Sequence, residues 1–249
     1  MIHLTHAMYR YPGGAEIGPV DLQVAPGEIV LLTGPTGCGK STVLRMAAGL
    51  LQRHGQGALT GEVRIGGHDP ATLVATERVR MLGFVGQDPD DAVVSVTCAA
   101  EVAFAMESAG ASPAHIEARL AEVLPALGLD GAADPARLSG GQRQRLAIAA
   151  TLAAGARALL LDEPLSQLDP EGAEAVMALL ERLARDGVAV LLVEHRLEQT
   201  LPRADRTLLM AEGRIVAFDL PALRALGLRG PALLELGASV GPAPWRLRD

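Results

Sequence analysis

The stretch that decides the fold covers residues 34–42 and reads Gly34-Pro35-Thr36-Gly37-Cys38-Gly39-Lys40-Ser41-Thr42. It fits the phosphate-binding pattern G-x-x-x-x-G-K-[ST]. Residues 28–33 before it are apolar enough to form a buried strand, and the residues after it place Val43, Leu44 and Ala47 at helical spacing. A strand, a glycine loop and a helix therefore follow in the order that phosphate binding requires. The alternative is a glycine-rich turn that fits the pattern by chance, and such a turn would not need these flanking elements.

All nine residues of this loop are expected to contact a nucleoside triphosphate. Glycines let the main-chain N–H groups turn toward one anion, and the start of the following helix adds partial positive charge. The Lys40 ammonium would reach the β- and γ-phosphates, and the Ser41 hydroxyl would bind Mg²⁺. The sequence thus predicts a site for a nucleoside triphosphate and Mg²⁺.

The composition limits the class of protein further. A chain of 249 residues is one large domain or a domain with subdomains. Hydrophobic residues make up 49% and aromatic residues only 2%, so the core is expected to consist of Leu, Val and Ala. A formal net charge of −7 argues against binding to the phosphate backbone of nucleic acids, which usually requires a basic face.

The cysteines and the apolar stretches bear on the compartment. Cys38 and Cys98 are too few for a disulfide framework, so reduced cytosolic thiols are expected. The first residues do not resemble a signal peptide. The most apolar stretch, residues 146–161, is interrupted by Gly155 and Arg157, and it falls short of the roughly 20 apolar residues of a membrane span. We therefore expect a chain that is soluble by itself.

Several strands are expected before the first helix and after it. Ile2, Leu4 and Met8 alternate as in an edge strand, and residues 20–24 form a second strand. Residues 61–67 and residues 79–85 are expected to add two more strands. Tyr11 stands just before a glycine turn, where its ring could stack on a base or could simply cover apolar surface; spacing alone leaves both open.

Residues 88–137 are expected to form a small helical insertion. Thr97 can cap a helix that runs through Ser108, and Ser112 followed by Pro113 can start another. Pro125 should end or kink that second helix. After the insertion, Ser139 can cap a helix whose first turn contains glycines, which makes either a second anion site or an ordinary capped helix.

Two buried strands deliver polar residues at their carboxyl ends, where ligands bind in open α/β sheets. Residues 158–161 lead to Asp162, which suits a Mg²⁺ shell, and to Glu163, which could accept a proton from an attacking water. Both acids could also be solvated loop charges. Residues 188–193 lead to His195, which could contact a γ-phosphate or could be a structural histidine. Residues 208–210 and 215–218 are expected to form a closing hairpin.

Taken together, these motifs resemble those of the ATP-binding-cassette (ABC) ATPases over roughly residues 2–218. Residues 34–42 match the Walker A loop, Gln87 the Q-loop, Leu138-Ser139-Gly140-Gly141-Gln142 the LSGGQ signature, residues 159–163 Walker B, residues 166–169 the D-loop, and His195 the switch histidine. The resemblance implies an α/β P-loop fold, with a mostly parallel core sheet flanked by helices, an N-terminal antiparallel β subdomain and an inserted helical subdomain. The implied division is residues 1–87 with 138–218 as the core, 88–137 as the helical subdomain and 219–249 as a C-terminal extension.

The resemblance also implies roles for single residues. Glu163, His195, Gln87 and Lys40 would be catalytic, with Ser41, Gln87 and Asp162 at Mg²⁺ and Tyr11 on the adenine. In a head-to-tail dimer, Ser139, Gly140, Gly141 and Gln142 of one chain would close over the ATP bound by the other. Because Cys38 lies at a helix N-terminus, it is also expected to react readily with thiol reagents, with ATP protecting it.

Weaker similarities point to the ATPases of energy-coupling factor (ECF) importers of vitamins or metal ions such as cobalt and nickel. They lie in residues 87–93, 101–104, 194–198 and 227–231. In that family a groove near the Q-loop receives arginine-bearing helices of a transmembrane coupling subunit, which Asp88, Asp90 and Asp91 could face, unless they only cap the next helix.

The expected partners are this coupling or permease subunit, a second ATPase subunit (a copy or a paralogue) and a substrate-capture membrane subunit. The expected location is the cytoplasmic face of the membrane. The ATPase of a conventional importer or exporter, and a soluble ABC protein that clamps nucleic acid or ribosomes, remain alternatives.

Overall fold

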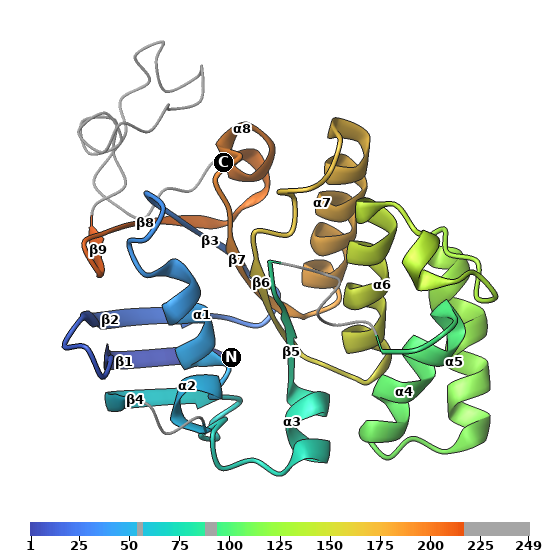
Figure 1. The fold of residues 1–249 in the computed structure, drawn as a ribbon, viewed down its shortest axis with the longest axis horizontal. Helices are drawn as coiled ribbons and strands as arrows, with labels where there is room; N and C mark the ends of the chain where they lie inside the picture. Colours follow the sequence, from blue (N-terminus) through green and yellow to red (C-terminus); the bar gives the residue numbers. More distant parts are fainter. Residues whose placement is uncertain (54–56, 88–93, 217–249) are drawn as a thin grey trace.

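The computed structural model describes residues 1–53, 57–87 and 94–216, and it contains two sheets with helices packed around them (Figure 1). The smaller sheet is antiparallel and three-stranded, in the order β2-β1-β4. Its strands are β1 (Ile2–Arg10), β2 (Glu16–Val24) and β4 (Ala58–Ile65). The expected first strand is therefore present, but the prediction that it lies at an edge is wrong, because β4 pairs with its other side.

The larger sheet has six strands in the order β5-β6-β7-β3-β8-β9, and all but β9 run parallel. Its strands are β3 (Ile29–Thr33), β5 (Leu82–Val85), β6 (Ala158–Asp162), β7 (Ala189–Val193), β8 (Arg206–Ala211) and β9 (Arg214–Val216). The expected α/β fold with a mostly parallel core sheet and an antiparallel β sheet is confirmed.

Alternate side chains of the core strands face two separate hydrophobic cores. On β6, Leu159 and Leu161 join the core shared with α6 and α7, whereas Leu160 joins the core shared with α1 and the smaller sheet. All five residues of β3, β6 and β7 are buried. Strands that are covered on both faces need continuous apolar sequence, which explains why these segments are recognisable without alternation.

Helices cover both faces of the core sheet (Figure 1). They are α1 (Lys40–Ala47), α2 (Leu50–Arg53), α3 (Ala75–Met81), α4 (Cys98–Ser108), α5 (Pro113–Ala126), α6 (Gly140–Ala153), α7 (Pro170–Arg185) and α8 (Leu197–Thr200), with 3₁₀ turns at Pro135–Arg137 and Leu201–Arg203. Helix α6 lies between the core sheet and the pair α4 and α5. The prediction of one strand over residues 79–85 is wrong in its first half, because α3 extends to Met81 and β5 begins at Leu82.

The expected helix caps are confirmed. The side chains of Thr97, Ser112 and Ser139 accept hydrogen bonds from main-chain N–H groups at the start of α4, α5 and α6. Pro125 lies one residue before the last residue of α5, so the helix ends there as expected. Within the ranges given above, no helix is long and apolar enough to cross a membrane. Asp88, Asp90 and Asp91 and the tail from residue 217 lie outside the described residues.

Candidate functional site

The candidate site lies where three neighbouring strands of the core sheet end. Strands β6, β7 and β3 are adjacent and parallel, so their carboxyl ends meet at one edge. β3 leads into the phosphate loop, β6 into Glu163, and β7 into His195. The sheet topology therefore brings together residues that are more than a hundred positions apart in the sequence.

The backbone of the phosphate loop requires its glycines. Gly34, Gly37 and Gly39 all have positive φ angles, of 150°, 80° and 109°. A Cβ atom on Gly34 would lie 2.1 Å from the carbonyl oxygen of Met210, so β8 leaves no room for a side chain. This conformation ends at Gly39, the N-cap of α1, and places the start of that helix at the loop, as anion binding requires.

The Lys40 side chain is buried inside the phosphate loop. Only 5% of its surface is exposed, and its ammonium donates to the carbonyl oxygens of Gly34 and Pro35 at 2.9 and 2.8 Å. These bonds hold the charge at the centre of the loop and compensate its burial.

The Cys38 thiol is also buried, and burial raises its pKa despite the Lys40 charge. The raised pKa argues against the reactive thiolate expected at Cys38. The helix N-terminus and the neighbouring ammonium favour the thiolate, but the loss of hydration outweighs them.

Asp162 and Ser41 provide oxygen atoms that suit a hard cation. The Ser41 hydroxyl donates to Asp162 Oδ1 at 3.1 Å. Burial raises the pKa of Asp162, the nearby Glu163 charge raises it further, and the Ser41 bond opposes both. The described residues contain no group of three acidic, His or Cys side chains that could hold a metal ion alone. One carboxylate and one hydroxyl fit Mg²⁺, which usually completes its shell with phosphate oxygens and water.

Glu163 contacts two of the other predicted catalytic residues. Its Oε1 lies 2.7 Å from His195 Nε2, and its Oε2 accepts a hydrogen bond of 3.1 Å from Gln87 Nε2. Glu163 also adopts a φ of 52°, which a residue with a side chain rarely does. Its N–H donates to the carbonyl oxygen of Val193 at the end of β7, which ties this unusual backbone to the neighbouring strand.

Tyr11 lies beside the phosphate-loop helix. Its hydroxyl is 2.8 Å from Thr42 Oγ1, and its ring meets that of Tyr9 edge-on with centroids 4.8 Å apart. The side chain is half-buried, so one part of it stays accessible. Stacking of Tyr11 on a base stays a prediction.

The second predicted anion site does not line the phosphate loop of the same chain. Ser139 and Gln142 form a reciprocal capping box at the start of α6. Together with Gly140 and Gly141 they border a hollow whose other wall is the segment that leads into α7, including Gln167 and Asp169. No residue of the phosphate loop lines this hollow.

Sequence reasoning named residues 194–198 only as a similarity to ECF ATPases, and it missed the structural roles of Glu194 and Arg196 on either side of His195. Glu194 is 1% exposed, and its carboxylate accepts main-chain hydrogen bonds from Leu165, His195 and Arg196. The sequence did contain a signal for Glu194, because a charged residue directly after a fully apolar strand is expected to be buried. A buried carboxylate needs hydrogen-bond donors around it.

Comparisons with known proteins place this geometry in a family. The fold and the glycine loop define a nucleotide-binding protein of the P-loop class. A family model described as ABC transporter matches residues 17–166, which is more than half of the chain. The chain belongs to this family.

Individual relatives carry related names. The chain is 42% identical to a putative ABC transporter ATP-binding protein of Streptomyces avermitilis, over 100% of this chain and 46% of that protein. It is 35% identical to the energy-coupling factor transporter ATP-binding protein EcfA2 of Methanospirillum hungatei, over 95% and 61%. The chain spans about half the length of the first curated relatives it matches.

Solved structures agree with this assignment. The dimeric, post-hydrolysis structure of the ATP-binding cassette MJ0796 with ADP and Pi is 28% identical, with a TM-score of 0.75 over 86% of this chain and 96% of that one. The structure of cbiO1 from Clostridium perfringens, part of the transporter complex cbiONQ, has a TM-score of 0.77 over 94% and 97%. At 24% identity, that second likeness bears on the fold alone.

Proposed function

We propose that this chain is the subunit that hydrolyses ATP to power a membrane importer of the ECF type. The observation that carries the hydrolytic role is the position of the Glu163 carboxylate, between Gln87 and His195 at the edge where the phosphate loop begins. The similarity to EcfA2 supports the ECF type. A vitamin or a cobalt or nickel ion is the proposed class of cargo.

The proposed reaction is the attack of a water oxygen on the γ-phosphorus of ATP, which breaks the bond to the β-phosphate oxygen and releases ADP. Glu163 accepts the proton of that water, or orients it. Lys40 neutralises phosphate charge, and His195 stabilises the charge that develops on the γ-phosphate. Bound through Ser41, Asp162 and Gln87, Mg²⁺ would neutralise phosphate oxygens.

Two chains are proposed to form a head-to-tail dimer, in which residues 139–142 of one chain contact the ATP of the other. The capping box fixes the conformation at the start of α6, and this helix start borders a hollow, which supports the role. The proposed division of the chain is a core of residues 1–87 and 138–218, a helical subdomain of residues 88–137 and an extension of residues 219–249.

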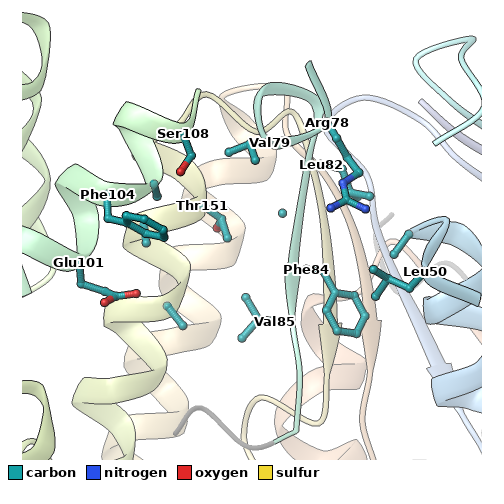
Figure 2. Close-up of a pocket in the computed structure, with 15 residues that line it drawn as sticks. Leu50, Arg78, Val79, Leu82, Phe84, Val85, Glu101, Phe104, Ser108 and Thr151 are labelled. Carbon is teal, nitrogen blue, oxygen red and sulfur yellow. The ribbon is translucent and has the colours of Figure 1, made fainter. Parts of the chain in front are cut away.

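The transmembrane subunit is proposed to dock on a groove between α4 and β5 (Figure 2). Figure 2 shows Phe104 and Glu101 on the α4 wall, with Phe84 and Leu50 on the opposite wall. Phe104 is 53% exposed and lines the groove together with other apolar side chains, which supports contact with an apolar partner helix. Glu101 also lines the α4 wall, but it is only 7% exposed and its carboxylate accepts from the N–H groups of Val94 and Ser95. The chain would then work at the cytoplasmic face of the membrane.

Affinity capture of the tagged full chain from mild-detergent extracts of its own membranes tests this proposal. We expect a coupling subunit and a small integral capture protein, identified by mass spectrometry. Phe104→Glu should reduce their recovery about tenfold or more, because it places a charge on the apolar wall. The matched control is Val74→Glu, which charges a 59% exposed valine that does not line the groove.

Other outcomes of the capture would correct specific parts of the proposal. Recovery of a conventional permease would retain the ATPase role and refute the ECF assignment. Failure to recover any membrane protein would refute the transport role and favour the soluble-clamp alternative.

A further inference from the structure

The Glu194 carboxylate joins the backbones that carry Glu163 and His195. Its Oε1 accepts from the N–H of Leu165, two residues after Glu163, at 2.8 Å. Its Oε2 accepts from the N–H groups of His195 at 2.8 Å and Arg196 at 3.2 Å. One buried side chain thus fixes the two loops whose side chains meet at 2.7 Å between Glu163 Oε1 and His195 Nε2.

Arg196 holds the same loop from its other end. Its Nη1 donates to the carbonyl oxygen of Leu168 at 2.8 Å, and its Nη2 donates to that of Ser166 at 3.2 Å. A planar guanidinium fixes two acceptors at once, so it restrains the direction of the loop as well as its distance. Residues 165–168 are therefore attached to the segment after β7 by hydrogen bonds at Leu165, Ser166 and Leu168.

The attached loop also contacts the start of α6. A Cβ atom on Gly140 would lie 3.3 Å from the carbonyl oxygen of Gln167, and one on Gly141 would lie 3.3 Å from Leu168 Cδ2. The loop thus lies between the catalytic pair and the helix start that is proposed to serve a second chain. A shift of the loop relative to β7 would disturb both.

We propose that Glu194 and Arg196 are positioning residues that set the Glu163–His195 pair for hydrolysis by fixing residues 165–168. This inference rests on the proposed ATPase function and adds residues that act through their neighbours rather than by touching ATP. Neither side chain contacts the phosphate loop in any hydrogen bond of the described residues. Their loss should therefore lower the rate of hydrolysis and leave ATP affinity unchanged.

The test uses the full chain with Glu194→Gln and Arg196→Lys. An amide can accept through only one of its two terminal atoms. Glu194→Gln therefore keeps the shape of the side chain but loses the hydrogen bonds to one of the two loops. The matched control is Glu28→Gln. Glu28 is also a shielded carboxylate, which accepts from the N–H of Ala25 and pairs with Arg206, but it precedes β3 at the opposite end of the sheet.

Three readouts separate positioning from general stability. We expect one of the two amides of Leu165 and His195, the one that the glutamine NH₂ now faces, to exchange hydrogen at least about tenfold faster in Glu194→Gln than in the wild type. The value of kcat should fall about 10- to 100-fold, while the ATP dissociation constant stays within about threefold, since only the catalytic geometry is loosened. Arg196→Lys should lower kcat in the same direction, and Glu28→Gln should change none of the three.

Each alternative result overturns the inference. Faster exchange with an unchanged kcat would mean that the joint is structural only, and a lower kcat with unchanged exchange would mean that Glu194 acts by another route. ATP binding weakened in proportion to kcat would show general damage. A wild-type chain that hydrolyses no ATP would refute the proposed function itself. An active wild type with an equally active Glu194→Gln would refute only the positioning role of Glu194.

Discussion

Replacing Glu163 by glutamine separates the proton-accepting role of this residue from its structural role. Glutamine has the same shape, and the geometry allows it to keep both contacts. Its amide oxygen can accept from Gln87 Nε2, 3.1 Å from the present carboxylate, and its NH₂ can donate to an unprotonated His195 Nε2, which is now 2.7 Å away. The fold and the ATP site should therefore change little.

The expected magnitude follows from what is lost. An amide cannot take a proton from water at neutral pH, and a positioned general base typically contributes about 10²–10⁴-fold to the rate. We expect kcat to fall about 10²–10³-fold, which corresponds to about 2.7–4 kcal/mol of activation free energy. The dissociation constant for ATP should stay within about threefold, since this residue is not part of the phosphate loop.

The assay is phosphate release by the full chain at saturating ATP and Mg²⁺, with ATP affinity measured by equilibrium dialysis. Glu122→Gln serves as the control, because that carboxylate is 68% exposed and pairs with Arg119 on the surface of α5. A kcat within about threefold of the wild type would refute the catalytic role of Glu163. A large loss of ATP affinity would show instead that Glu163 supports binding.

Three further predictions address the metal site, the thiol and the core. Because burial raises the pKa of Asp162, ionisation of this residue lowers the stability of the fold as pH rises through the folded pKa. Asp162→Asn should therefore have a higher melting temperature than the wild type at pH 7.5 in EDTA, and the difference should vanish toward pH 4. The same variant should lose Mg²⁺-dependent ATP affinity. A lower melting temperature at pH 7.5 by calorimetry would contradict this. Because burial also raises the pKa of Cys38, iodoacetamide at pH 7.5 should label it at least about tenfold more slowly than glutathione, as followed by mass spectrometry; rapid labelling would restore the reactive-thiolate hypothesis. Leu160→Ala should lower the free energy of unfolding in urea by about 2–5 kcal/mol, because the side chain is fully buried in the core under α1, and a loss below about 1 kcal/mol would contradict that packing.

Features that depend on neighbouring residues were predictable from the sequence. The phosphate loop needs glycines at fixed offsets, and the caps at Thr97, Ser112 and Ser139 need only a side-chain oxygen and the N–H groups of the next turn. The three central strands were visible as continuous apolar runs because both of their faces are covered.

Features that depend on distant partners were not predictable. The alternation in β1 indicates a strand, but nothing in it reveals that β4, about 50 residues later, pairs with its free side. The apolar residues from Val79 onward fit a strand, yet the first of them complete the last turn of α3. At the site, the motifs identified Glu163 and His195 in the sequence. Their contact, and the hydrogen bonds of the buried Glu194 to both loops, depend on how the loops after two different strands meet.

The neighbouring positions of β5 and β6 in the core sheet have a consequence for how such chains can be altered. The chain leaves β5 at Val85 and returns to the adjacent strand at Ala158, and helices α4, α5 and α6 all belong to this excursion. Residues 86–157 therefore leave the core sheet and return to it at two paired strands, although α6 packs on that sheet. A chimera that takes this segment from a relative should keep the strand ends that hold Asp162, Glu163 and His195. It would exchange the α4 wall of the proposed docking groove, while Leu50 and Phe84 on the opposite wall would stay.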